Sequence, residues 1–251
     1  MGAKSQDPPA FVRLAAHPLR WRLLTALAGS DHRVRELVDL IGEPQNLVSY
    51  HLRLLRDGGL VTASRSSFDG RDSYYHLDLD HCAAALSGTA AALHPALRQQ
   101  SPAELPTGGG VLFICTGNSA RSPIAEALLR HRTSGRIEVA SAGIRPKTEL
   151  HPDAVRVLRH DFGIDLGDRR PRHFDTLTGH RFDFVISVCD KAREACPELP
   201  GRPRRMHWSI PDPATSGDPG HAFAHTAAAL DTRIRHLLPV LTASRIEGAQ
   251  P

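Results

Sequence analysis

The stretch Val111-Leu112-Phe113-Ile114-Cys115-Thr116-Gly117-Asn118-Ser119-Ala120-Arg121-Ser122 decides the fold of the second half of the chain. Its first four residues are apolar and predict a buried strand, and Pro123 to Arg132 predict a helix. The residues between them predict a loop whose backbone amides meet at the positive end of that helix. A strand, a loop and a helix in this order can bind a tetrahedral oxyanion, so chemistry on phosphate or arsenate is the leading hypothesis.

The residue types of the loop suit this chemistry. A helix N-terminus and a neighbouring arginine favour the thiolate form of a cysteine, so we expect Cys115 to be a nucleophile. Arg121 has a planar fork that matches two oxygens of an anion, Ser122 can donate to the thiolate, and Gly117 lets the backbone turn. The predicted oxyanion-binding residues are Thr116, Gly117, Asn118, Ser119, Ala120, Arg121 and Ser122.

A plainer interpretation of the loop is a buried structural cysteine beside a capped helix. A lone cysteine and a lone arginine would favour that interpretation. The whole octapeptide, placed after a strand and before a helix, favours the oxyanion site instead.

Four segments of the second half resemble the low-molecular-weight tyrosine phosphatase superfamily and, within it, the thioredoxin-coupled arsenate reductases. The first segment is the loop itself, with its Cys-x5-Arg-Ser pattern. The others follow in the family's order and are Ser141–Ile144, Val188–Pro197 and His207–Ala214. The resemblance covers about residues 109 to 245 and implies an α/β domain with a central parallel sheet.

Cys189 and Cys196 distinguish a reductase from a phosphatase. A phosphatase needs one thiol, because water completes its reaction, whereas the two electrons that reduce As(V) come from thiols that form a disulfide. If Asp190–Ala195 is helical, the step from Cys189 to Cys196 spans ~10.5 Å, beyond the ~7 Å limit for disulfide α-carbons. Their pairing would require the segment to unwind, which matches the loop rearrangement that the resemblance implies. Two buried apolar cysteines after the strand-like run Phe182–Val188 are the alternative.

The resemblance implies a relay of three cysteines. Cys115 attacks arsenic while Asp212, in the Ile-Pro-Asp-Pro motif, protonates the departing oxygen. Cys189 then attacks Cys115, and arsenite leaves. Cys196 displaces Cys115 and forms a disulfide with Cys189, which an external dithiol such as thioredoxin reduces. No bound cofactor is expected. The catalytic residues on this hypothesis are Cys115, Arg121, Cys189, Cys196 and Asp212.

A potassium ion is also a property of the family. Asn118, Glu126 and Ser141 match its usual ligands, but Gly167–Arg172 carries arginines where an acidic ligand would help. We therefore assign no metal.

The first hundred residues follow the pattern of a winged helix-turn-helix. Helical spacing of apolar residues between Phe11 and Ala28, interrupted at His17-Pro18, predicts two helices or one kinked helix. The apolar residues in this pattern are Leu14, Ala15, Trp21, Leu24 and Leu27. The other predicted elements are helices at Arg35–Ile41 and Asn46–Asp57, a hairpin at Val61–Leu79 around a glycine turn, and a helix at His81–Gln99.

The segment Val48–Leu55, followed by Gly59-Leu60-Val61, resembles the recognition helix of winged-helix repressors of the ArsR/SmtB class. We expect its core-facing residues to be Leu47, Val48, Leu52 and Leu55. The side chains expected to meet bases and phosphates of operator DNA are Gln45, Asn46, Ser49, Tyr50, Arg53, Arg65 and Arg71. The resemblance also implies a homodimer through this domain, and a winged helix kept only for dimerisation is the alternative.

One feature departs from the arsenic-sensing repressors. Two cysteines that many of them place before the turn align with Arg33 and Arg35, so that arsenite site is absent. Cys82 is the only thiol of the first hundred residues, and it cannot supply a three-thiolate site. We interpret Cys82 as a small hydrophobic residue of the dimer helix.

Composition and charge fit two soluble domains. The chain has 251 residues of which 41% are hydrophobic, and it has neither a run of ~18 apolar residues nor a secretion signal, so we expect a cytoplasmic protein. The first hundred residues carry 11 Lys and Arg against 10 Asp and Glu, and the remainder 20 against 17, which permits DNA binding without requiring it. The predicted boundaries are a winged helix at 9–99, a linker at 100–109 and a reductase-like domain at 110–246.

Three functions remain open on the sequence. The first is an arsenate reductase joined to a transcriptional regulator of arsenic resistance. The second is a regulator whose reductase-like half senses an oxyanion or the redox state. The third is a tyrosine phosphatase with a regulatory domain.

Overall fold

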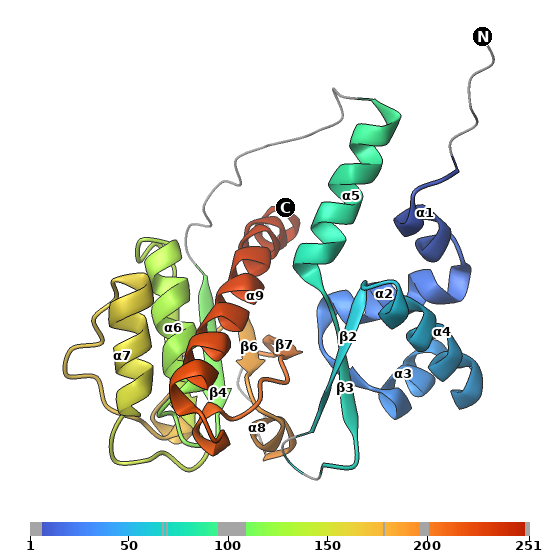
Figure 1. Ribbon diagram of the computed structural model, residues 1–251. Helices are drawn as coiled ribbons and strands as arrows, with labels where there is room; N and C mark the ends of the chain where they lie inside the picture. Colours follow the sequence, from blue (N-terminus) through green and yellow to red (C-terminus); the bar gives the residue numbers. More distant parts are fainter. Residues whose placement is uncertain are drawn as a thin grey trace. The chain divides into compact units, whose positions relative to one another are not determined.

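The computed structural model describes residues 7–66, 68, 70–94, 109–177, 179–195 and 201–248, with side chains as far as residue 242. The chain forms two compact units, each with its own hydrophobic core (Figure 1). Cys196, residues 100–108 of the predicted linker and the predicted helical residues 95–99 lie outside the described residues.

The first unit is helical with a small antiparallel sheet of order β1-β3-β2. Its elements are α1 (Ala10–Ala15), α2 (Pro18–Gly29), β1 (His32–Arg33), α3 (Val34–Ile41), α4 (Gln45–Asp57), β2 (Val61–Arg65), β3 (Ser73–Leu77) and α5 (Leu79–Leu93). His17 separates two helices, because its ring nitrogen Nδ1 accepts from the Leu19 amide and Pro18 occupies the first helical position. The predicted helix-turn-helix is therefore α3 and α4, and the hairpin is β2 and β3.

Two side chains of this unit differ from the prediction. The apolar pattern included Trp21 among the residues of the helical face, but its side chain is 54% exposed. Leu19 and Leu23 of α2 are buried instead. Leu47 is 37% exposed, whereas His51 is buried with Val48, Leu52 and Leu55. Positions three, four and seven residues after Val48 share one helix face, and Leu47 is turned ~100° from Val48, away from that face.

The predicted helix at His81–Gln99 is shifted. It begins at Leu79, because the carboxylate of Asp78 accepts from the His81 amide and caps the first turn. Its last helical residue is Leu93.

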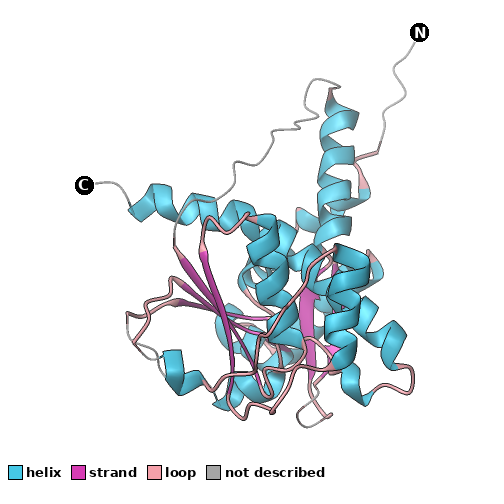
Figure 2. Cartoon of the chain, turned by 90° about the vertical axis from the view of Figure 1, so that its left-hand side faces the viewer, coloured by secondary structure: helices cyan, strands magenta, loops and turns pink. Residues whose placement is uncertain are grey.

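The second unit contains the predicted parallel sheet, with strand order β5-β4-β6-β7. Its elements are β4 (Gly110–Cys115), α6 (Arg121–Arg132), β5 (Glu138–Gly143), α7 (Pro152–Phe162), the 3-10 turn η2 (Phe174–Leu177), β6 (Phe184–Ser187), α8 (Asp190–Ala195), β7 (Arg204–His207), η3 (Pro213–Thr215) and α9 (Pro219–Gly248). Helices flank the strands in Figure 2, and α6, α7 and α9 pack on one another.

Strand β4 organises this unit. All six of its residues are buried, as expected for a central parallel strand covered on both faces. Helix α6 begins at Arg121, two residues before the predicted start, because a proline is tolerated in the first turn of a helix and Pro123 does not delay it. The strand-like run Phe182–Val188 is shorter than predicted and forms β6 between Phe184 and Ser187. Within the described residues, no helix combines the length and apolar character needed to cross a membrane.

Candidate active site

The candidate site lies at the carboxyl ends of the parallel strands. Cys115 ends β4, Gly143 ends β5 and His207 ends β7, while Cys189 follows β6 by two residues. Ligands of open α/β sheets bind at this edge. The parallel pairing thus brings together segments that are far apart in the sequence.

The loop after Cys115 is held by its carbonyl groups. The amides of Ile144, Arg145, Lys147 and His151 donate to the carbonyls of Cys115, Thr116, Gly117 and Ser119, at 2.8 to 3.2 Å. In a planar trans peptide the N–H and C=O groups point in opposite directions. Since the loop carbonyls face the segment after β5, the N–H groups of the same peptides point away from that segment. The amide of Asn118 donates to the Cys115 sulfur at 3.2 Å.

Gly143 allows this arrangement, and the sequence pattern did not single out its role. A Cβ atom at Gly143 would lie 2.8 Å from the Thr116 carbonyl oxygen and 3.0 Å from the Asn118 backbone nitrogen. The loop therefore packs directly on the end of β5. Asn118 itself adopts a left-handed conformation with φ of 45°, which asparagine tolerates better than most residues.

The Cys115 thiol has the predicted hydroxyl neighbour. Ser122 Oγ lies 3.0 Å from the Cys115 sulfur, and the side-chain amide of Asn118 donates to the same Oγ at 3.0 Å. All three residues are buried. The Cys115 sulfur thus accepts from the Asn118 amide and lies within hydrogen-bond distance of the Ser122 hydroxyl.

Arg121 and Asp212 meet at the site although 91 residues separate them. The Arg121 guanidinium donates to the Asp212 carboxylate at 2.7 Å and to the Ile210 carbonyl at 3.0 Å. Arg121 is buried, while the Asp212 side chain is 36% exposed. Asp212 also caps η3 by accepting from the Ala214 amide. The predicted acid therefore stands beside the predicted anion-binding arginine.

Cys189 lies against the same loop. Its sulfur shares a hydrogen bond of 3.3 Å with the Thr116 hydroxyl, and the thiol is 1% exposed. Burial, above all, raises the pKa of the Cys189 thiol, while the nearby Arg121 charge and the Thr116 hydroxyl act in the opposite direction. Cys189 also precedes α8, and its sulfur accepts from the Ala192 amide at 3.4 Å.

The helix expected between Cys189 and Cys196 is present as α8. A buried network that sequence reasoning missed holds its first residue. Asp190 accepts from Ser209 at 2.8 Å and lies 3.2 Å from the His207 ring nitrogen Nε2, and His207 Nδ1 lies 2.9 Å from Ser187 Oγ. The segment His207-Trp208-Ser209 supplies two residues of this network. The sequence alone did not show that the segment lies beside β6.

The three residues matched to potassium ligands do lie together. The Ser141 hydroxyl donates to Glu126 at 2.7 Å and accepts from the Asn118 side chain at 2.9 Å. Guanidinium groups of Arg130 and Arg169 donate to the other Glu126 oxygen at 2.7 and 2.8 Å. No group of three or more His, Cys, Asp or Glu side chains suited to a metal ion occurs within the described residues.

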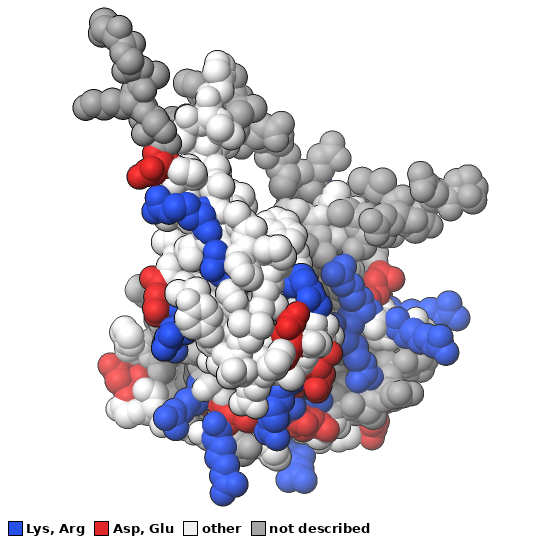
Figure 3. Space-filling model, turned by 90° about the vertical axis from the view of Figure 1, so that its right-hand side faces the viewer, with Lys and Arg blue, Asp and Glu red and all other residues white. Residues whose placement is uncertain are grey.

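The side chains predicted to meet DNA are all exposed. On α4 they are Gln45, Asn46, Ser49, Tyr50 and Arg53, and on the hairpin they are Arg65 and Arg71. The Arg53 guanidinium lies 5.6 Å from the Tyr50 ring centre. On the face drawn in Figure 3, Lys and Arg side chains alternate with Asp and Glu and form no single dense patch.

The positions aligned with the sensor cysteines form ion pairs instead. Arg33 and Arg35 lie 3.6 and 2.9 Å from the carboxylate of Asp72, ahead of β3. Burial and the Asp78 charge raise the pKa of Cys82 to about 11. Cys82 packs against the core of the first unit and is protonated at neutral pH.

Known proteins resemble each half of the chain separately. Residues 110–247 match the family described as low molecular weight phosphotyrosine protein phosphatase, and residues 17–63 match the bacterial regulatory protein, arsR family. Arsenate reductase of Shouchella clausii is 40% identical over 106 residues, which cover 41% of this chain and 73% of that protein. Arsenate reductase of Bacillus licheniformis is 38% identical over 104 residues, with the same two coverages.

Among solved structures, the low molecular weight protein tyrosine phosphatase of T. tengcongensis is similar to this chain. It is 27% identical, and the match covers 51% of this chain and 97% of that one with a TM-score of 0.44.

Proposed function

Since this chain belongs to the low molecular weight phosphotyrosine protein phosphatase family, with an arsR-family region ahead of that domain, we propose that it reduces arsenate and also binds operator DNA. On this proposal the second domain is the enzyme and the first domain is a regulator of arsenic resistance. Both activities then reside in one polypeptide.

The observation that carries the reductase proposal is the position of Cys189. Hydrolysis does not require a second thiol beside the nucleophile loop, whereas reduction requires one to supply electrons. The hydrogen bond between Cys189 and Thr116, the residue after Cys115, holds the Cys189 thiol against the nucleophile loop. The Thr116 hydroxyl can also stabilise the Cys189 thiolate when it attacks.

The first step binds and activates arsenate. Loop amides and the Arg121 guanidinium hold the oxyanion, and the Cys115 thiolate attacks arsenic. Asp212 donates a proton to the departing oxygen, which leaves as water. The product is an arsenic(V) thioester on Cys115.

The second step moves two electrons. The Cys189 thiolate attacks the Cys115 sulfur, the sulfur–arsenic bond breaks, and its electron pair leaves with arsenic as arsenite. A disulfide between Cys115 and Cys189 remains. Cys196 then attacks Cys189, which frees Cys115 as a thiolate, and an external dithiol such as thioredoxin reduces the disulfide between Cys189 and Cys196.

The last exchange requires a change in α8. Helix α8 covers Asp190–Ala195, and a helical rise continued from Cys189 to Cys196 would amount to ~10.5 Å, whereas disulfide α-carbons lie within ~7 Å of each other. We propose that α8 unwinds during this exchange. Oxidation should therefore lower the helix content of the protein.

The decisive experiment compares two reactions in the full-length protein. Steady-state arsenate reduction with thioredoxin and its reductase should be lost in Cys189→Ser, while hydrolysis of an aryl phosphate should persist. Cys82→Ser, at a thiol of the first domain, is the matched control and should retain both. Arsenate turnover by Cys189→Ser at the normal rate would exclude this relay. A parallel mass-spectrometric search for a disulfide between Cys115 and Cys189 after arsenate addition tests the intermediate directly.

The proposed DNA-binding half is supported by the exposed face of α4 and by α5. Helix α5 has no buried residue within this chain, and its Leu86 and Leu93 are 51% and 76% exposed, which suits a dimer contact. We propose a homodimer with two recognition helices on a palindromic operator. Light scattering on the full chain tests the dimer, and a gel shift with DNA upstream of its own gene tests binding.

A further inference from the structure

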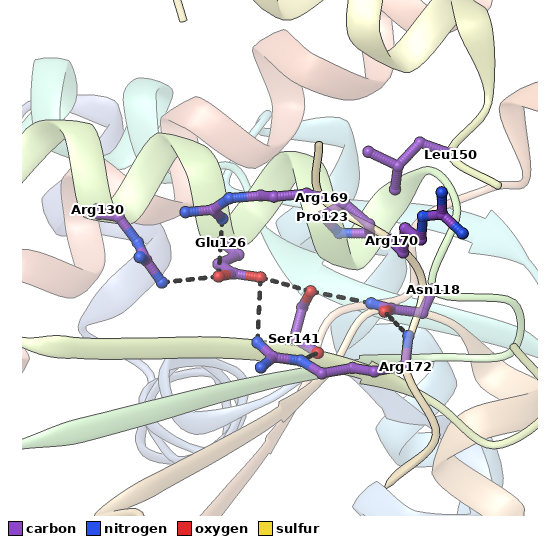
Figure 4. Close-up of a pocket in the computed structure, with 9 residues that line it drawn as sticks. All are labelled: Asn118, Pro123, Glu126, Arg130, Ser141, Leu150, Arg169, Arg170 and Arg172. Carbon is purple, nitrogen blue, oxygen red and sulfur yellow. Dashed lines mark hydrogen bonds and ion pairs between the residues drawn. The ribbon is translucent and has the colours of Figure 1, made fainter. Parts of the chain in front are cut away.

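The second unit contains a cavity of about 320 Å³ rich in arginine, which we call the arginine pocket. Its charged lining residues are Glu126 and Arg130 of α6 and Arg169, Arg170 and Arg172 of the segment after α7. Figure 4 shows these side chains, with Ser141 of β5 between Glu126 and Asn118 of the loop. Four guanidinium groups and a single carboxylate thus line the pocket, and three of these groups contact the carboxylate.

The carboxylate already accepts three hydrogen bonds. Glu126 is 5% exposed, one oxygen accepts from Arg130 and Arg169, and the other accepts from Ser141. A cation would have to displace guanidinium groups to reach these oxygens. The balance of four positive groups against one negative group therefore favours an anion in the pocket.

Part of the donor capacity of the pocket is unused. The exposed Arg170 makes no hydrogen bond or ion pair with the described residues, and Figure 4 shows its side chain without a contact. The buried Nε atom of Arg130 likewise has no hydrogen-bond partner within the described residues. Burial lowers the pKa of Arg130, and the charges of Arg169 and Arg172 lower it further, against the opposing effect of Glu126. An anion would supply acceptors and relieve the repulsion between the guanidinium groups.

We propose that the arginine pocket is a second binding site for a free tetrahedral oxyanion, of the sulfate or phosphate type. The planar fork of an arginine matches two oxygens of such an ion, and several forks from one segment can surround it. The cavity volume lies at the lower end of the roughly 300–1,000 Å³ typical of small-molecule sites. This inference does not depend on arsenate being the substrate.

The pocket adjoins the Cys115 loop through one residue. The Asn118 side chain accepts from the Arg172 amide at 2.9 Å and donates to Ser141, while its own amide donates to Cys115. An anion that orders Arg172 thus also orders the residue that fixes the loop. The two sites share Asn118 but use different arginines, since Arg121 lies at the Cys115 loop and does not line the arginine pocket.

The test is calorimetric titration of the reduced full-length protein with sodium sulfate at constant ionic strength. The wild type should bind two sulfate ions per chain. Arg170→Ala should weaken one of the two sites roughly ten- to hundredfold, the usual effect of losing a charged hydrogen-bond donor. Arg136→Ala, at an exposed arginine of the same unit outside the pocket, is the matched control and should leave both sites unchanged.

A second measurement assigns the two sites. Sulfate in the loop protects Cys115 from iodoacetamide, and this protection should have the same midpoint in Arg170→Ala as in the wild type. A stoichiometry of one sulfate per chain in the wild type would overturn the proposal. So would an Arg170→Ala variant that titrates like Arg136→Ala, or one whose lost site is the site that protects Cys115.

Discussion

Substitution of Gly143 by alanine tests whether the end of β5 positions the nucleophile loop. The new methyl carbon would lie 2.8 Å from the Thr116 carbonyl oxygen, and ordinary carbon–oxygen contacts lie at roughly 3.3–3.6 Å. The loop would have to recede by roughly 0.5 Å. Since a displacement of about 1 Å at a catalytic group can cost ~10²-fold, we expect kcat/KM for arsenate to fall about tenfold.

The same clash should lower stability by about 1–3 kcal/mol, as other overpacked positions do. The assays are urea unfolding and steady-state arsenate reduction on the full-length protein. Gly217→Ala is the matched control, because no heavy atom lies within 4 Å of the added carbon and the backbone there needs no positive φ. The reasoning is refuted if Gly143→Ala matches Gly217→Ala in both assays.

Three further predictions concern the thiols and the DNA-binding face. Thr116→Val removes the hydroxyl beside Cys189 and should slow formation of the disulfide between Cys189 and Cys115 by about tenfold. Thr116→Ser keeps a hydroxyl and should retain the rate, and quenched single-turnover mass spectrometry measures both variants. Because burial raises the pKa of Cys189, its thiolate fraction is small at neutral pH, and the same rate should rise with pH from 6 to 9; a flat profile would show that another step is limiting. Arg53→Ala should weaken operator binding by about 1–3 kcal/mol in a gel shift at fixed salt, and an unchanged dissociation constant would remove Arg53 from the interface.

Local patterns predicted the elements that carry the chemistry. The apolar run before Cys115 is β4, the segment between Cys189 and Cys196 is α8, and the helix-turn-helix pattern is α3 and α4. Each of these depends on periodicity and on turn residues within about a dozen positions. The prediction that Cys115 ends a buried strand ahead of a loop and a helix therefore required no knowledge of tertiary contacts.

Other features depend on residues that are distant in the sequence. The need for glycine at position 143 arises from a loop carbonyl 27 residues earlier, and the pairing of Arg121 with Asp212 spans 91 residues. The exposure of Leu47 is a related case, because hydrophobicity alone does not tell which apolar residue of a helix meets the core. No local pattern contains these contacts, since parallel strands bring the segments together only after folding.

The buried bonds at Asp190 have a consequence for the proposed redox cycle. His207 and Ser209 fasten the first residue of α8 to the edge of the sheet, next to Cys189. The far end of the helix should give way first, so that Cys196 travels while Cys189 stays within reach of the nucleophile. On the proposed relay, a stationary Cys189 and a moving Cys196 would pass the disulfide outward to the external dithiol, while the electrons travel inward from that dithiol to arsenic.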